Sequence, residues 1–400
     1  MNMTEQQIKN LACELSGLAV FRSVLKTKPL QLLVKYLACE GDVYERLSCY
    51  GEFVSSLADD AFCFASFLQK TVYEDENSYV IAEANHRAVP QVLAENARAE
   101  LRLFSRLTEL DRQSLCGCLR FEGYLPAFDN YPVDFVEEYE KRLRNIGRYG
   151  YGVFAGASMF RVDAGNIVAV KAVDHVSLSD FVGYESERQK VIDNTQALIE
   201  GRAAANALLF GDAGTGKSST VKACVNQFAD QGLRLIELRK DQLFSLSHVM
   251  DRIADNPLKF IIFIDDLSFN KNDDCFSMLK AALEGSASAK ARNAVIYATS
   301  NRRHIVKETF SDRSSGDDVH INDTVQELMS LSDRFGLTVY FSKPNKQLYL
   351  QIVHELARKA GLVMDAQQLE AKAEAFALAK GSRSPRAAGQ FIASMMQTEI

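Results

Sequence analysis

The sequence predicts an α/β fold in its second half: a parallel sheet with helices on both faces, preceded by a mostly α-helical N-terminal domain and followed by a C-terminal helical lid. Three observations predict this fold. Apolar residues recur at helical spacing over the first 150 residues. Short apolar strands then alternate with helical segments, which is typical of a parallel sheet. Three further helical stretches close the chain.

Composition limits the class of protein. A chain of 400 residues exceeds the size of one compact core and predicts two or three domains. Its hydrophobic content of 47% and charged content of 24% fit a soluble globular protein. The net charge of −6 argues against a surface that binds nucleic acid. We find no run of 18 apolar residues and no secretory signal, so we expect a cytoplasmic protein with no membrane association.

Residues 1–150 form the predicted N-terminal helical domain, and nothing in them points to chemistry. The eight cysteines are scattered along the chain, so we expect reduced thiols rather than disulfides. Residues 151–177 change in composition towards Gly, Ala and β-branched residues, and predict a hairpin that turns at Ala164, Gly165 and Asn166. We interpret this hairpin as a junction between two domains.

Residues 178–344 form the predicted α/β domain. Its strands are NALLF, LRLIEL, KFIIFID, NAVIYATS and LTVYF, with helical segments between them. Residues 345–400 form the predicted lid, whose three helices are KQLYLQIVHELARKAG, AQQLEAKAEAFALAK and PRAAGQFIASMMQ. This order predicts a nucleotide-binding domain followed by a small helical domain.

A P-loop follows the first of these strands. The pattern GxxxxGK[ST] lies between the strand NALLF and the helical run SSTVKACVNQF, which is the context that this motif requires. Its glycines let backbone N–H groups converge on phosphate oxygens, while the lysine reaches the β and γ phosphates and the hydroxyl binds Mg²⁺. The loop comprises Gly211, Asp212, Ala213, Gly214, Thr215, Gly216, Lys217 and Ser218, and Ser219 follows it.

Polar residues follow two later strands. Asp265 and Asp266 come directly after the apolar strand KFIIFI, at the edge where open α/β sheets bind ligands. We expect Asp265 to hold Mg²⁺ and Asp266 to act as a general base towards the attacking water. Asn301 follows the strand NAVIYATS, and its amide could hydrogen-bond both the γ phosphate and this water.

The order of these motifs resembles that of the AAA+ ATPases: a P-loop, an Asp-Asp pair, Asn301, the string LSDRFG and an Arg near the last helix. More narrowly, IDDLSF, YATSNRRH and DDVHINDTVQELMSLSDRFGL resemble the bacterial family of predicted AAA+ ATPases known as domain of unknown function 815. This resemblance covers roughly residues 178–400. It implies an AAA+ nucleotide-binding domain with bound ATP and Mg²⁺, and it leaves the cellular role open.

The resemblance implies roles for further residues. Lys217 and Ser218 match Walker A, Asp265 and Asp266 match Walker B, and Asn301 matches sensor 1. Arg334 stands where related ATPases have a finger that enters a neighbour's site, and the alternative is a surface Arg paired with Asp333. Arg386 in GSRSPRAAGQF is the first candidate for sensor 2, with Arg383 as the second. Gly183 and Tyr184 resemble the segment that lines the adenine pocket, although a helix-capping loop has the same pattern.

Two departures from the family pattern stand out. Walker B usually ends in Asp-Glu, and here Asp266 takes the place of Glu, as in some replication-initiator relatives. The segment RKDQLFSLSHVM lacks the aromatic-apolar-Gly pore loop of protein unfoldases, so we do not favour an unfoldase. We expect Phe244 in this segment to pack in the core, and the alternative is that it takes the place of the pore-loop aromatic residue.

The first hypothesis is Mg²⁺-dependent binding and hydrolysis of ATP by a homo-oligomer, coupled to a conformational change in the chain or in an unknown protein partner. A second is a nucleotide-gated switch with little hydrolysis, suggested by the shorter acid at position 266. A third, suggested by Arg302, Arg303 and His304, is a loader or initiator ATPase associated with nucleic acid. The acidic net charge makes this third hypothesis the least favoured.

Overall fold

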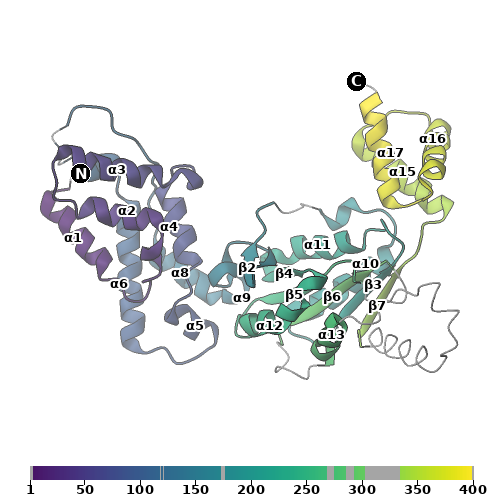
Figure 1. Ribbon diagram of the computed structural model, residues 1–400, viewed down its shortest axis with the longest axis horizontal. Coiled ribbons are helices and arrows are strands. Elements are labelled where there is room, and N and C mark those ends of the chain that lie inside the picture. Colours follow the sequence, from purple (N-terminus) through teal and green to yellow (C-terminus); the bar gives the residue numbers. More distant parts are fainter. Residues whose placement is uncertain are drawn as a thin grey trace. The chain divides into compact units, whose positions relative to one another are not determined.

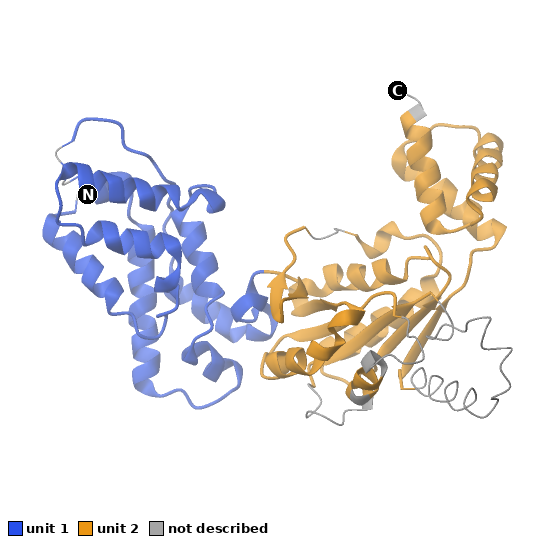
Figure 2. Cartoon of the chain, in the orientation of Figure 1, with its two compact units in different colours: residues 1–156 blue, residues 157–400 orange. Residues whose placement is uncertain are grey.

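The computed structural model describes residues 3–117, 119, 121–172, 176–267, 274–284, 292–301 and 334–398. The chain divides into two compact units, Met1–Gly156 and Ala157–Ile400 (Figure 2). The fold class predicted from the sequence is confirmed: unit 1 is helical, and unit 2 has a mostly parallel sheet followed by three helices. Within the described ranges, no helix combines the length and the apolar character needed to cross a bilayer.

Unit 1 is built from helices whose apolar residues share one face. In α6 (Gln91–Thr108), Ala97, Leu101 and Phe104 lie at helical spacing and are at most 1% exposed. Edge-to-face aromatic contacts fill the core, among them Phe21 with Phe104 at 5.5 Å between ring centroids. The other helices are α1 (Glu5–Ser16), α2 (Lys28–Leu37), α3 (Val43–Ser55), α4 (Phe64–Tyr73), α5 (Ser78–Ala84), α7 (Arg112–Cys116), α8 (Phe135–Arg144) and α9 (Ile146–Tyr149).

The sheet of unit 2 has seven strands in the order β2-β1-β4-β5-β6-β3-β7 (Figure 1). All its neighbours pair in parallel except β1 with β2. Every strand predicted within residues 178–344 forms. The strands are β1 (Met159–Asp163), β2 (Asn166–Ala169), β3 (Ala207–Gly211), β4 (Leu233–Leu238), β5 (Lys259–Ile264), β6 (Ala294–Ser300) and β7 (Leu337–Phe341).

The predicted hairpin forms, but its interpretation as a junction is wrong. β1 pairs in parallel with β4, with Phe160 opposite Ile236, so the hairpin belongs to the sheet. The turn has two residues, Ala164 and Gly165, both with positive φ, which is the turn geometry that suits a tight hairpin. The hairpin joins the sheet because this buries apolar side chains: Met159, Phe160 and Val162 are at most 4% exposed. The sheet therefore begins before residue 178.

Helices cover both faces of the sheet, with α10 and α11 on one side and α12 and α13 on the other (Figure 1). Covered on both faces, β5 is a continuous apolar run whose residues Phe260–Ile264 are 0% exposed. This burial fixes the strand that ends at Asp265. The helices are α10 (Glu185–Ile199), α11 (Lys217–Phe228), α12 (Leu246–Ala254) and α13 (Asp274–Glu284).

The three predicted C-terminal helices are α15 (Lys346–Ala360), α16 (Ala366–Lys380) and α17 (Pro385–Thr398). The side chains of Asn345 and Asp365 cap the first turns of α15 and α16. Both helices end at glycines with positive φ, Gly361 and Gly381. Their shared core includes Tyr349, Phe391 and Ala388.

One side chain does not lie where the sequence suggested. Phe244, expected in the core, is 67% exposed in the 3₁₀ segment η6 (Lys240–Ser245). Its neighbour Leu243 takes the core position and is 1% exposed. Consecutive residues of a 3₁₀ turn point in different directions, and here Leu243 faces the core while Phe244 faces outward.

The end of β3 gives a prediction on stability. Gly211 has φ +133°, and a Cβ there would lie 2.0 Å from the Phe341 carbonyl oxygen. Gly201 also has positive φ, but a Cβ there would meet nothing within 4 Å. In urea unfolding, we expect Gly211→Ala to lower the free energy of unfolding by at least about 2 kcal/mol more than Gly201→Ala. Equal losses in the two variants would contradict the close approach of β3 and β7.

Candidate nucleotide-binding site

The P-loop connects the end of β3 to the start of α11. Gly214 and Gly216 have φ of +76° and +92°, which bends the chain back before the helix begins at Lys217. The Thr215 hydroxyl donates to the Asp212 carbonyl at 2.9 Å and closes the loop. The N–H groups at the start of α11 are thereby presented in the geometry that binds anions.

Lys217 is buried beneath this loop, with 5% of the residue exposed. Its ammonium group donates to the carbonyl oxygens of Gly211 at 3.1 Å and Asp212 at 2.7 Å, and to Asn301 Oδ1 at 3.1 Å. Burial lowers the pKa of Lys217, and the carboxylates of Asp212, Asp265 and Asp266 oppose this effect. All three hydrogen-bond acceptors are uncharged, so an anion would be a stronger partner for this lysine.

The register of the sheet brings Asp265 to the P-loop helix. Ile264 pairs with Ala298, which sets Asp265 beside Thr299. Asp265 Oδ1 accepts hydrogen bonds from Ser218 Oγ at 2.6 Å and from Thr299 Oγ1 at 2.5 Å. The carboxylate and the Ser218 hydroxyl thus form an oxygen-rich pair of the kind that binds Mg²⁺.

Asp266 is held in an unusual backbone conformation. Its φ is +51°, in the left-handed region, and its N–H donates to Thr299 Oγ1 at 2.9 Å. The Asn301 amide donates to Asp266 Oδ1 at 2.8 Å. A non-glycine residue at positive φ is strained, and such strain gathers at functional sites. Here it directs the second carboxylate towards Asn301 and Lys217.

These groups open into a cleft of about 480 Å³ within unit 2. Its lining comes from three regions, which are the P-loop with the strand ends, residues 180–188, and the helices α15 and α17. The lining comprises Asp180, Phe181, Val182, Tyr184, Arg188, Ala213, Gly214, Thr215, Gly216, Lys217, Ser218, Ser219, Asp265, Asp266, Thr299, Asn301, Ile352, Leu356, Pro385, Arg386 and Gly389.

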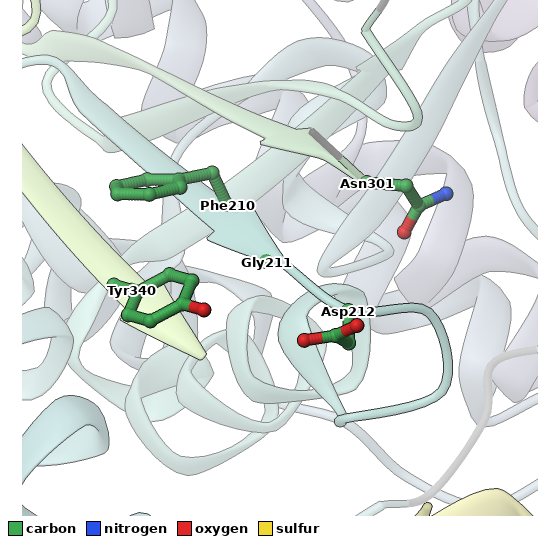
Figure 3. A pocket seen from close by; sticks show the side chains of 5 residues that line it. All are labelled: Phe210, Gly211, Asp212, Asn301 and Tyr340. Atoms are coloured by element: carbon green, nitrogen blue, oxygen red, sulfur yellow. The ribbon is translucent and has the colours of Figure 1, made fainter. Parts of the chain in front are cut away.

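A second hollow, of about 460 Å³, adjoins the P-loop at the ends of β3, β6 and β7 (Figure 3). Phe210 and Tyr340 stack side by side there, with ring centroids 5.1 Å apart. Gly211, Asp212 and Asn301 complete its described lining. Asn301 is therefore shared by both hollows.

The two residues predicted to line an adenine pocket differ in their surroundings. Tyr184 lines the cleft, but its hydroxyl donates to the Ser342 carbonyl at 2.6 Å and its ring packs on Phe341. Burial raises the pKa of Tyr184 to about 12. Gly183 is not among the lining residues, and its N–H donates to Glu185 Oε1 at 2.9 Å.

The two candidates for sensor 2 are also distinguished. Arg386 lines the cleft, and its N–H donates to the Gly214 carbonyl at 3.3 Å. Arg383 instead donates through two nitrogens to Glu374, at 3.0 and 2.9 Å. A guanidinium engaged in this bidentate pair has few donors left for a ligand. The geometry favours Arg386.

Arg334 does not reach this cleft. It precedes β7, whose first residue Leu337 pairs with Ala207 at the start of β3, whereas the P-loop begins at the other end of β3. Five strand residues separate these edges by about 13 Å. Asp333 and the triplet Arg302, Arg303 and His304 lie outside the described residues.

Two solved structures are similar to part of this chain at low sequence identity. Its structure is similar to that of a Thermotoga maritima RuvB variant at 15% identity and a TM-score of 0.36, covering 54% of this chain and 62% of that one. It is similar to a FIGL-1 AAA domain in complex with ADP at 17% identity and a TM-score of 0.36, covering 50% and 67%. No match was found among curated proteins.

The family described as protein of unknown function (DUF815) matches residues 155–399. The chain belongs to the DUF815 family. This confirms the family predicted from the sequence. The match begins next to the boundary between the two units, so it contains the sheet, the cleft and the C-terminal helices and leaves almost all of unit 1 outside.

Thr299 and Arg188 are among the lining residues of this DUF815 protein that escaped the sequence analysis. Thr299 carries a signal that could have revealed it, since it lies two residues before Asn301 and strand residues at that spacing share a face. Arg188 has no such signal in the sequence. It lies among charged residues in ESERQK, and the helical pattern alone does not show which of these charged residues is buried. Its position in the cleft follows only from the packing of α10 on α11.

Thr299 gives a prediction that needs no ligand. It is 2% exposed and holds both Asp265 and the Asp266 amide, so Thr299→Val removes two hydrogen bonds with little change in volume. We expect a loss of about 1–3 kcal/mol in the free energy of unfolding in urea, because buried polar groups lose their partner. The matched control is Thr338→Val on an exposed strand position, where a loss under about 0.5 kcal/mol is expected. The account of the site would be contradicted by similar values for both.

Proposed function

We propose that this DUF815 protein binds ATP with Mg²⁺ in the cleft and hydrolyses its γ phosphate. The observation that carries the proposal is the convergence of the Lys217 ammonium with the Ser218–Asp265 oxygen pair at one end of the P-loop helix. A cation, helix N–H groups and a metal-binding oxygen pair in one place match the charge of a magnesium-bound triphosphate.

The oxygen atoms of the site supply only part of the coordination shell of Mg²⁺. Ser218 and Asp265 supply hard oxygen ligands. Among the residues that the structure describes, no group of three or more His, Cys, Asp or Glu could hold a metal by itself. Phosphate oxygens and water would have to complete the six ligands that Mg²⁺ requires, so metal and nucleotide would bind together. When bound, Mg²⁺ neutralises charge on the β and γ phosphates.

The chain's own residues account for the remaining steps. Lys217 would exchange its three neutral acceptors for phosphate oxygens, and the P-loop N–H groups would hold the β phosphate. Asp266 would accept the proton of the attacking water. Asn301, which already donates to Asp266 at 2.8 Å, would orient that water between the carboxylate and the γ phosphate.

The C-terminal helices would act as a lid. Arg386 lies against the P-loop through its backbone contact with Gly214, and its side chain lines the cleft. Its guanidinium would therefore interact with phosphate and couple the presence of the γ phosphate to the position of α17. Hydrolysis would release this contact, which provides the conformational change that acts on a protein partner.

A homo-oligomer would complete the site. Arg334 lies at the edge of the sheet opposite its own P-loop, so its guanidinium would serve a neighbouring subunit rather than its own. An arginine supplied in this way stabilises charge that develops on the transferred phosphoryl group. Turnover would then depend on assembly.

A nucleotide-gated switch with little hydrolysis is the second candidate. It is favoured by the hydrogen bond from the Asn301 amide to Asp266 Oδ1, because this bond occupies an oxygen that a general base needs to accept the proton of water. Aspartate is also shorter than the glutamate that most related ATPases have, which would increase the distance to the water. The two candidate functions predict different rates of ATP hydrolysis, and both predict that ATP binds.

Substitutions at the two ends of the site separate binding from hydrolysis. By titration calorimetry with Mg·ATP, we expect Lys217→Ala to weaken binding at least about 100-fold, because a charge-assisted contact is lost. Lys222→Ala on the same helix is the control, since Lys222 pairs with Glu237 at 3.7 Å. Asp266→Asn should keep its affinity and lose hydrolysis by a factor on the order of 100 or more. Unchanged phosphate release in Asp266→Asn would favour the switch.

Complementation tests the neighbouring-subunit role of Arg334. We expect Arg334→Ala and Lys217→Ala each to have little ATPase activity, and their mixture to regain part of it, since one supplies an intact P-loop and the other an arginine. Arg202→Ala is the control, because Arg202 pairs with Glu200 on the surface. Turnover per subunit that does not vary with protein concentration and is insensitive to Arg334→Ala would contradict the proposal.

A further inference from the structure

Arg188 lies buried in the lining of the cleft, and the carboxylates that act on its charge are those of Glu185 and Glu187. Its side chain is 9% exposed, and its guanidinium lies over the Phe181 ring at 5.4 Å from the centroid. The nearest carboxylate oxygen recorded for it belongs to Glu185, 3.6 Å from Nη2 and beyond hydrogen-bond distance. Within the described parts of the chain, we find no hydrogen bond from this guanidinium. Burying a charge without hydrogen-bond partners is energetically unfavourable. Such a group is therefore a candidate for binding a ligand.

Arg188 lies beside the apolar part of the cleft lining. Its guanidinium is over the Phe181 ring, and the neighbouring Val182 packs with Ile352 and Leu356, which also line the cleft. A planar base fits such an apolar wall, whereas phosphates need Lys217 and the P-loop N–H groups. A triphosphate held at Lys217 would therefore extend its base towards Phe181 and Arg188.

We propose that Arg188 contacts the base of the bound nucleotide and lets the cleft accept GTP alongside ATP; this inference rests on the proposed nucleotide site. A guanidinium has five donors and no acceptor. Guanine offers two adjacent acceptors, O6 and N7, which match this fork, whereas adenine has an amino donor beside N7. Arg188 thereby raises the affinity for guanine relative to adenine.

The other polar groups at this end do not offset that effect. Asp180 also lines the cleft, but its Oδ2 accepts from the Ser177 N–H at 2.8 Å and its Oδ1 lies 3.9 Å from Lys359 Nζ. Glu185 is not among the lining residues, and its side chain is 76% exposed. The base therefore meets donors from Arg188, and none of the carboxylates among the described lining residues is as buried as this guanidinium.

The test compares three nucleotides on two proteins. Calorimetric titration of wild type and Arg188→Gln with the magnesium complexes of ATP, GTP and ITP gives their affinity ratios. Glutamine carries a donor and an acceptor and matches adenine N6 and N7, so we expect the GTP-to-ATP ratio to fall about tenfold or more in the variant. ITP, which keeps O6 and N7 but lacks the guanine amino group, should follow GTP. Arg202→Gln on the surface should leave the ratio unchanged.

The results of this titration separate the nucleotide site from the role of Arg188. If wild type binds none of the three nucleotides, the proposed function fails. If nucleotides bind and the ratio is the same in wild type and Arg188→Gln, the role of Arg188 is wrong while the nucleotide site stands. Should Arg188→Gln fail to fold by thermal unfolding, Arg188→Met keeps an unbranched stem and removes all five donors, and the ratio must still fall. An unchanged ratio in Arg188→Met would then overturn the inference.

Discussion

The Asp265 carboxylate joins three elements of the sheet domain, and the geometry of the candidate site depends on it. It accepts from Ser218 on α11 and from Thr299 at the end of β6, while its own chain leaves β5. These bonds form because parallel strands end at one edge and the register sets Ile264 opposite Ala298. The fully buried apolar run of β5 favours that register, since a shift along its neighbours would draw the Asp265 carboxylate into the buried part of the sheet. Packing within the sheet thus determines where the polar groups meet.

The fold and the centre of the site were predictable because their signals are local. Alternating apolar strands and helices, the P-loop spacing and Asp265 at a strand end each lie within a few consecutive residues. What depends on contacts between distant segments was not predictable. The hairpin joins the sheet because Phe160 packs beside Ile236, and Phe244 is exposed because Leu243 fills the core. Arg188 enters the cleft only through the packing of α10 on α11, for which the sequence has no pattern.

The polar groups of the cleft are arranged for a ligand that brings negative charge. Lys217, Arg188 and Arg386 all line it, and the first two are buried, yet the acceptors of Lys217 are neutral and Arg188 lacks a hydrogen bond within the described chain. Burial of two cations is unfavourable in isolation and becomes favourable with a polyphosphate. Proposed roles for Arg334 and Arg386 extend the same principle to a neighbouring subunit and to the lid. The proposed nucleotide site would in this way link the stability of the protein to its affinity for nucleotide.

The most direct measurement is a crystal structure with Mn²⁺ in place of Mg²⁺ and a non-hydrolysable ATP analogue. The account predicts one anomalous peak at coordination distance from Ser218 Oγ, next to Asp265, with the Lys217 ammonium moved from the Gly211 and Asp212 carbonyls onto phosphate oxygens. A well-ordered crystal grown at saturating analogue, with Lys217 still bonded to those carbonyls and neither metal nor phosphate against the P-loop, would contradict it.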